Sequence, residues 1–356
     1  MPTISAAQLH RFVAGWCAAG GSEPYEAELV ADHLVRANLT GHDSHGVGML
    51  PHYAHDLDNE TLVPNRQVEI MTDSGAVLAL DGQRGYGQVV AKEALDLAVG
   101  RARELGACVI ALRNSHHVGR IGHWAEQCAA AGMASVHFVN VVDHDPLVCT
   151  FGGSEARLGT NPFCAAFPGE DGPLALLDMA TSKIALGKVR VAMNKRVETP
   201  KGALLDAGGR PTRDPNVMFS EPKGGLVAFG EHKGSGLAVM CEIFAGVLTG
   251  AWTIQPGNPR RDGIVNHMLA IVIHPAVFGD PARMRAEAQA LRGFIEAARP
   301  TGEAPPMLPG DPERRHLAER EAEGIPVDDG TWAAVREAAG AVGMPAAEID
   351  GLLRAR

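Results

Sequence analysis

The stretch ACVIALRNSHHVGRIGHWAEQCAAAG, residues 107–132, decides how this chain folds. Its first part, 107–112, is an apolar run of strand length, and its last part, 123–131, reads as a helix. Between them lies the polar segment 114–120, which holds two adjacent histidines. Strand, polar loop and helix in this order predict a lobe in which a sheet carries functional residues where its strands end.

The flanking sequence extends this pattern in both directions. Strands are predicted at 68–70, 77–80, 135–142, 163–167, 174–177 and 268–273, and helices at 5–20, 22–41, 88–105, 233–250, 281–298, 331–342 and 345–353, with a proline-rich loop at 300–312. We expect an α/β fold of the mixed α+β kind. Residues 1–70 form the N-terminal part of a helical lobe, 71–225 form a mixed α/β lobe, and 226–356 return to the helical lobe.

The composition narrows the function. The chain has 356 residues, 46% hydrophobic and 21% charged, which is the balance of a folded globular protein. A net charge of 32 − 42 = −10 argues against a nucleic-acid partner. No apolar stretch is long enough to span a membrane, and no signal peptide is visible. The six cysteines form no C-x-x-C pair, so we expect reduced, mostly buried thiols in a cytoplasmic protein.

Histidine is the strongest chemical signal. Nine of the fifteen histidines lie between residues 42 and 144. Histidine suits proton transfer near neutral pH and also binds metals. The i, i+3 histidine pairs at 42/45 and 52/55 lack the further ligands of a metal shell, so we expect no metal site. The motifs G-x-G-x-x-G and G-x-x-x-x-G-K-[ST] are both missing, so neither a Rossmann site nor a P-loop is indicated.

Three other segments have both a structural and a functional interpretation. The segment 158–162 (LGTNP) is either a plain turn or a ligand-facing turn. The segment 178–183 (DMATSK) is either a helix cap or a contact to a ribose or phosphate. The helix start at 233–236 (KGSG) is either a site of close packing or an anion site made of free amides and a lysine.

Five segments in this order resemble the type 2 malate/L-lactate dehydrogenase family. They are SHGVGMLPHY (44–53), NSHHVG (114–119), LGTNP (158–162), LDMATS (177–182) and HKGSGLA (232–238). The resemblance implies a non-Rossmann nicotinamide-binding lobe with a mixed sheet, and a homodimer. It also implies that His117 is the catalytic acid and base, and that His45 lies at the reactive end of the cofactor site.

The resemblance implies further site residues. Cofactor contacts carry over to His45, Gly119, Arg120, Ile121, Thr160, Asn161, Asp178, Met179, Ala180, His232, Lys233, Gly310 and Asp311. Substrate contacts carry over to Ser44, Met49, Tyr53 and Arg120. The cofactor is expected to be NAD or NADP, with NAD favoured.

One position departs from the family pattern. Many members carry an arginine for the substrate carboxylate where this chain has Met49. We expect Arg120, three residues after His117, to bind the carboxylate instead, with Met49 facing bulkier or aromatic substrate side chains. The alternatives are that Arg120 binds a cofactor phosphate or caps the following helix.

The predicted function is an NAD(P)-dependent oxidoreductase that interconverts small 2-hydroxycarboxylates and 2-oxocarboxylates. Two alternatives stay open at this point: a metal-dependent hydrolase or lyase built on the histidines, and a non-catalytic ligand-binding protein.

Overall fold

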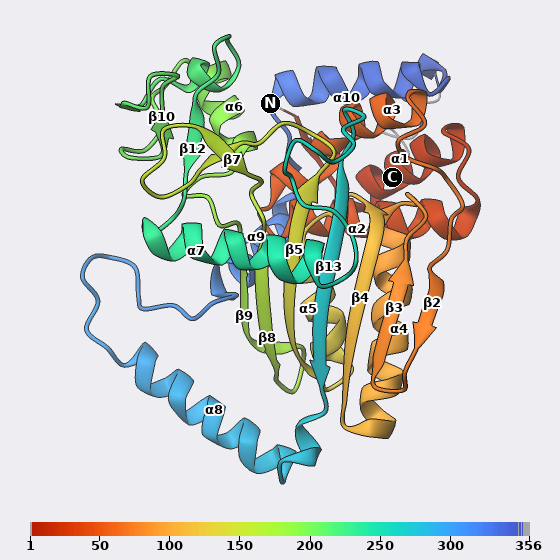
Figure 1. Ribbon diagram of the computed structural model, residues 1–356, viewed down its shortest axis with the longest axis vertical. Coiled ribbons are helices and arrows are strands. Elements are labelled where there is room, and N and C mark those ends of the chain that lie inside the picture. The colour runs from red at the N-terminus through yellow and green to blue at the C-terminus, as the bar shows by residue number, and fades with distance from the viewer. Residues whose placement is uncertain (1, 348, 350, 352–356) are drawn as a thin grey trace.

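The computed structural model describes residues 2–347, 349 and 351, and its centre is a seven-stranded mixed sheet (Figure 1). In spatial order the strands are β2 (Glu69–Asp73), β3 (Val77–Asp81), β4 (Ala107–His116), β13 (Val265–Ile273), β5 (Ala134–Val142), β8 (Phe163–Pro168) and β9 (Pro173–Met179). The pair β3–β4 is parallel, and the other neighbours run antiparallel. The predicted mixed sheet is confirmed.

The segment 107–132 folds as its pattern predicts. Alternate side chains of β4, at Cys108, Ile110 and Leu112, are buried on one face of the sheet. Helices α4 (Gly87–Leu105) and α5 (Gly122–Ala130) contact the sheet. Strand β4 continues to His116 instead of ending at 112, so the histidine motif begins inside the sheet.

Both chain ends build a separate helical core, as predicted. Helices α1 (Ala6–Ala19), α2 (Pro24–Leu39), α3 (Leu50–Asp58) and α10 (Asp329–Ala341) contribute to it, and β1 (Thr3–Ile4) pairs with β14 (Ile325–Pro326). Ser5 caps α1 through a reciprocal capping box with Gln8. Two short 3₁₀ turns, Asp43–His45 and Val47–Met49, connect α2 to α3.

The expected boundary at residue 225 is wrong in one respect. The segment 226–356 does not simply return to the helical lobe, because its strand β13 lies in the middle of the large sheet, between β4 and β5. Helix α9 (Asp311–Glu323) was not predicted, and it buries no residue, so it has no apolar stripe to reveal it. The predicted helix 345–353 falls partly outside the described residues.

The predicted helix 233–250 changes geometry along its length. It consists of α7 (His232–Cys241) followed by a π-helical segment, Glu242–Val247. Helix α8 (Pro281–Glu296) begins at the predicted cap, Asp280. None of its residues is buried, and it stands apart from the body of the molecule (Figure 1).

A second, smaller sheet escaped prediction. Its order is β11 (Pro211–Thr212), β10 (Leu204–Leu205), β12 (Gly225–Val227), β6 (Val148–Cys149) and β7 (Ala156–Leu158), and it is accompanied by α6 (Leu186–Lys195) and the 3₁₀ turn Pro215–Met218. Strands of two or three residues are too short to show a period-2 pattern, so no sequence pattern predicts them.

Two further expectations concern the whole chain. No helix among the described residues combines the length and apolarity needed to cross a membrane. All six cysteines are buried as free thiols, as the sequence predicted.

Candidate active site

The backbone around His117 is fixed from three sides. The His116 amide donates to the Gly85 carbonyl at 3.0 Å, and the Val118 amide donates to Asn266 Oδ1 at 2.8 Å. A Cβ on Gly87 would lie 2.3 Å from the His117 carbonyl oxygen, so only glycine lets the start of α4 come this close. The loop after β4 therefore presents His117 at a defined position.

The His117 side chain is held by a chain of two buried hydrogen bonds. Its Nδ1 lies 2.8 Å from the Tyr53 hydroxyl, and Gln88 Nε2 donates to the same hydroxyl at 2.8 Å. His117 is 8% exposed. Its other ring nitrogen, Nε2, makes no hydrogen bond to a residue that the structure describes, so this atom is available to a ligand.

His45 lies beside His117 with nearly parallel rings. The ring centroids are 5.6 Å apart and the planes differ by 23°. Ser44 Oγ lies 3.0 Å from His45 Nδ1. Asn38 Oδ1 accepts from the Val47 amide at 2.9 Å, which ties this segment to α2. The structure thus brings the histidines of two distant motifs together.

His116 has a different environment from His117. Its side chain is fully buried, and its Nε2 lies 2.7 Å from Asp56 Oδ2. Burial is the largest single influence on Asp56 and raises its pKa, but the hydrogen bonds and charges of His116 and His55 together outweigh burial and lower the pKa of that carboxyl. His116 is therefore a structural partner of α3, and its Nδ1 is buried without a hydrogen-bond partner, whereas His117 keeps 8% of its surface exposed.

Burial favours the neutral form of both His117 and His45. Burial, followed by the nearby His45, lowers the pKa of His117 well below its usual value. Burial also lowers the pKa of His45 to about 4. A neutral imidazole at neutral pH can accept a proton, as oxidation of an alcohol requires.

Three side chains that were expected to contact a ligand are paired or packed inside the protein. Arg120 is 2% exposed, and its Nη2 donates to Glu126 Oε1 at 2.8 Å while its Nε lies 3.4 Å from Asp178 Oδ2. Met49 is buried in the core of the helical lobe. Asn161 is fully buried, and its Nδ2 donates to Glu242 Oε1 at 2.9 Å. Two carboxylates therefore already lie against Arg120, although its Nε and Nη1 have no hydrogen-bond partner among the described residues.

The loop after His117 offers mainly its backbone. Ile121 packs into the core beneath the sheet. Gly119 has φ +69°, and a Cβ there would lie 2.1 Å from His33 Nε2. The Gly122 amide donates to Asp178 Oδ2 at 3.0 Å, which joins the start of α5 to the end of β9.

The remaining expected cofactor residues lie on several elements. Met179 and Ala180 are half-buried at the end of β9, where the Thr160 carbonyl accepts from the Thr181 amide at 2.9 Å. His232 and Lys233 are exposed at the start of α7. Gly310 has φ +98° in a loop bound to β9, since the Leu176 amide donates to the Pro309 carbonyl at 2.9 Å. The Asp311 carboxylate is already paired with Arg292 and Arg314.

Comparison with known proteins identifies the relatives of this architecture. Residues 4–336 match the family described as malate/L-lactate dehydrogenase. The chain belongs to that family. It is 47% identical over 344 residues to hydroxycarboxylate dehydrogenase B of Escherichia coli O157:H7, covering 96% of this chain and 95% of the relative. It is 43% identical over 252 residues to an L-lactate dehydrogenase of Cupriavidus necator, covering 70% and 72%.

Solved structures agree with the sequence relatives. An Escherichia coli protein provisionally described as a malate/lactate dehydrogenase superposes with a TM-score of 0.95 at 45% identity, over 99% of this chain and 98% of the other. Sulfolactate dehydrogenase of Methanocaldococcus jannaschii gives a TM-score of 0.84 at 29% identity, over 98% and 99%. The resemblance seen in the five motifs is confirmed, and the chain is a dehydrogenase.

Two residues around the candidate site escaped sequence reasoning: Gln88, which bonds Tyr53 behind His117, and Arg190, which lies on the helix that packs on the His45 segment. Gln88, in the first turn of α4, carries no signal beyond being a polar residue in an otherwise apolar turn. Arg190, in α6, is exposed, and its guanidinium lies 5.5 Å from the centre of the Phe219 ring. A Cβ on Gly187, one turn earlier, would lie 2.7 Å from Ser44 Cβ, so α6 packs directly on the His45 segment.

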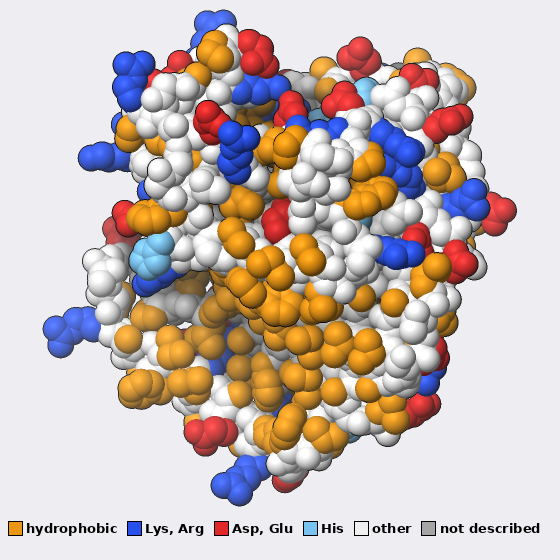
Figure 2. Space-filling view, viewed as in Figure 1, with side chains coloured by type: hydrophobic (Ala, Val, Ile, Leu, Met, Phe, Trp, Pro, Cys, Tyr) orange, Lys and Arg blue, Asp and Glu red, His pale blue; other side chains and the backbone are white. Residues whose placement is uncertain are grey.

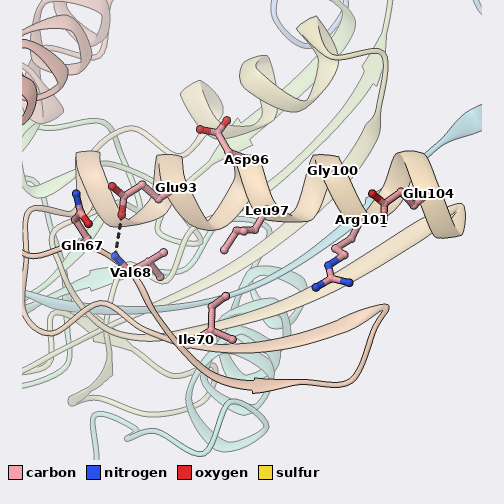
Figure 3. Close-up of a pocket in the computed structure, with 9 residues that line it drawn as sticks. All are labelled: Gln67, Val68, Ile70, Glu93, Asp96, Leu97, Gly100, Arg101 and Glu104. Atoms are coloured by element: carbon pink, nitrogen blue, oxygen red, sulfur yellow. Dashed lines mark hydrogen bonds between the residues drawn. The ribbon is translucent and has the colours of Figure 1, made fainter.

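The site of the family motifs is distinct from the surface pocket of about 830 Å³ between β2 and α4 (Figure 3). That pocket is lined by Gln67, Val68, Ile70, Glu93, Asp96, Leu97, Gly100, Arg101 and Glu104. None of these residues belongs to the five motifs. Among the described residues, no three His, Cys, Asp or Glu side chains group as metal ligands would.

Proposed function

We propose that this dehydrogenase interconverts a 2-hydroxycarboxylate and a 2-oxocarboxylate with a nicotinamide cofactor, NAD in preference to NADP, and that His117 moves the proton. The observation that carries this proposal is the arrangement of His117. It is neutral, anchored through Nδ1 to Tyr53, and free at Nε2 beside a second neutral histidine, His45. The names of the relatives, which include hydroxycarboxylate, lactate and sulfolactate dehydrogenases, support the substrate class.

The described residues fit such a cofactor in their chemistry. A nicotinamide cofactor, when bound, accepts or supplies the hydride. The exposed Lys233 at the start of α7 suits a phosphate group. The Asp178 carboxylate accepts one amide at the start of α5 and has further acceptor capacity for ribose hydroxyls. His45 would lie against the nicotinamide end, next to His117.

The proton step follows from the two nitrogens of His117. During oxidation, Nε2 takes the hydroxyl proton of the substrate. The resulting imidazolium carries a proton on each nitrogen, and the proton on Nδ1 is donated to the Tyr53 hydroxyl. During reduction the same imidazolium returns its Nε2 proton to the developing alkoxide.

The substrate carboxylate needs a cation other than Arg120, and Arg190 supplies it in this proposal. Arg190 is exposed and has no carboxylate partner among the described residues. Burial lowers the pKa of His52, and the charge of Arg190 lowers it further, so the guanidinium acts on the turn that also carries Tyr53. A planar guanidinium binds a carboxylate through two parallel hydrogen bonds.

The proposed assembly is a homodimer in a reducing compartment such as the cytoplasm. Apolar side chains gather over the sheet and α7 on the face shown in Figure 2. The exposed ones include Val239, Met240, Ile243, Val247, Leu248, Phe278, Leu291 and Phe294. A patch this extended marks an interface, and a second copy is the partner that the family resemblance implies. Sedimentation of the wild type and Phe294→Glu would test it: a monomeric wild type contradicts the dimer.

The activity test is a panel of 2-oxo acids with NADH and with NADPH, followed by loss of absorbance of the reduced cofactor. We expect turnover with at least one acid and faster turnover with NADH. The absence of turnover with every acid and both cofactors, in folded protein, would refute the proposal.

A further inference from the structure

Gln88 ends the hydrogen-bond chain behind His117, and only one end of its amide is used. The side chain is 1% exposed, and its Nε2 donates to the Tyr53 hydroxyl at 2.8 Å. Its Oε1 is buried and has no partner among the described residues. A buried amide oxygen without a partner is uncommon and costly.

The orientation of the Gln88 amide decides where the hydroxyl proton of Tyr53 points. Tyr53 has a single hydroxyl proton, and its oxygen already accepts from Gln88. The proton therefore points to His117 Nδ1, which must act as the acceptor. A neutral His117 then carries its own proton on Nε2. In this tautomer the nitrogen that faces the substrate cannot take the hydroxyl proton.

Rotation of the Gln88 amide by a half-turn reverses every bond in the chain. Oε1 then accepts from Tyr53, and the Tyr53 oxygen accepts from His117 Nδ1–H. Nε2 is left with its lone pair toward the substrate. Both arrangements hold the same number of protons: one imidazole proton moves from Nε2 to Nδ1 through solvent while the hydroxyl and the amide rotate. The second arrangement satisfies the buried Oε1 and leaves the amide Nε2 in the position that has no partner, so each orientation leaves one end of the amide unpaired.

We propose that Gln88 is a positioning residue whose amide orientation sets the tautomer of His117, and with it the readiness of His117 to accept a proton. The inference rests on the proposed role of His117 as the acid and base. Gln88 acts only through Tyr53.

Few other charged groups lie around the hydrogen-bond chain Gln88–Tyr53–His117. Gln88 lies on the first turn of α4, which Gly87 holds against the His117 backbone. The described titratable groups that interact with Tyr53 or His117 include Cys17, His33, His45, His52, Asp56, Tyr86, His116 and His144. Of these only Asp56 is an anion at neutral pH, and it is paired with His116. A charge introduced at residue 88 would therefore be the main new influence on His117.

The test compares Gln88→Glu with Gln88→Met. A carboxylate at residue 88 only accepts, so it fixes the Tyr53 proton toward residue 88, and its charge favours the imidazolium of His117. In Gln88→Glu we expect the acidic limb of the kcat/KM profile for hydroxyacid oxidation to move up by at least about one pH unit. Gln88→Met removes both amide functions, and we expect kcat to fall about 10- to 100-fold with unchanged NADH affinity.

A matched control is Gln127→Met, on α5, whose amide bonds Lys92 and Asp96 away from His117. It should leave the pH profile in place. A profile in Gln88→Glu identical to the wild type, or a wild-type kcat in Gln88→Met, would overturn the proposal.

Nitrogen NMR of ¹⁵N-histidine protein reads the tautomer directly and does not depend on turnover or on the buried charge of the glutamate variant. The His117 signal is assigned by its loss in His117→Asn. We expect wild type and Gln88→Met to differ in the fraction of the Nδ1–H tautomer; equal fractions would overturn the proposal. If the tautomer responds while no 2-hydroxyacid is turned over, the proposed function fails and the role of Gln88 stands.

Discussion

Substituting the two adjacent histidines one at a time should separate catalysis from stability. In His117→Ala, the lost hydrogen bond to Tyr53 costs about 1 kcal/mol of stability, because Tyr53 keeps its bond to Gln88. Loss of a general acid and base lowers kcat about 100- to 10,000-fold. We therefore expect an inactive protein that is close to the wild type in its free energy of unfolding.

His116→Ala should show the opposite balance. It leaves the Asp56 carboxylate buried without its main hydrogen-bond partner; burial lowers the pKa of His116, so this partner is a neutral imidazole, and its loss from a buried charged group costs about 3 kcal/mol or more. His55, which lies 3.2 Å from Asp56 and is half exposed, keeps one interaction, so the lower end of that range applies. Turnover should fall far less than in His117→Ala.

The assays are urea unfolding at one protein concentration, NADH binding by fluorescence, and kcat with the best acid of the panel. NADH binding serves as the control that each variant is folded. If His116→Ala abolishes turnover in a stable protein while His117→Ala stays active, the assignment of His117 is refuted.

Three more outcomes follow from the same structure. Because burial lowers the pKa of His117, kcat/KM for hydroxyacid oxidation should stay level as the pH falls through 6.5. Reduction needs the imidazolium, so its rate should rise as the pH falls. An oxidation profile that breaks near 6.5, the ordinary pKa of histidine, would contradict this expectation. Burial also lowers the pKa of His137 to about 4 and that of His267 to about 3. Below about pH 6.5 the unfolded chain therefore binds more protons at these histidines than the folded chain does. Each histidine then lowers the free energy of unfolding by about 1.4 kcal/mol per pH unit, down to its folded pKa. Urea unfolding at pH 7, 6 and 5 should show this slope, and it should be shallower in His137→Gln. Arg190→Met should raise KM for the 2-oxo acid about 10- to 100-fold, with little change in KM for NADH. The control is Arg213→Met, which replaces an exposed arginine paired with Glu198 and should change neither KM. Equal effects of the two variants would show that Arg190 does not bind the substrate.

Local sequence alone determined the elements with a strong pattern. The apolar run before residue 113 and the helical spacing after residue 122 predicted β4 and α5, because both patterns depend only on neighbours in the chain. Ser5 marked the start of α1 and Asp280 that of α8 for the same reason. The five motifs also indicated the family, and they named His117 and His45 before any contact between them was known.

Tertiary structure decided which partners each residue meets. Nothing near 265–273 says that β13 enters between β4 and β5, because strand pairing joins residues more than a hundred positions apart. Arg120 lies three residues after His117 in sequence, yet it pairs with Glu126 and Asp178 inside the protein. Gln88 reaches His117 only through Tyr53, a residue from another lobe. Spacing along the chain fixes which face a side chain occupies, but the energy of a buried polar group depends on partners that only the folded chain supplies.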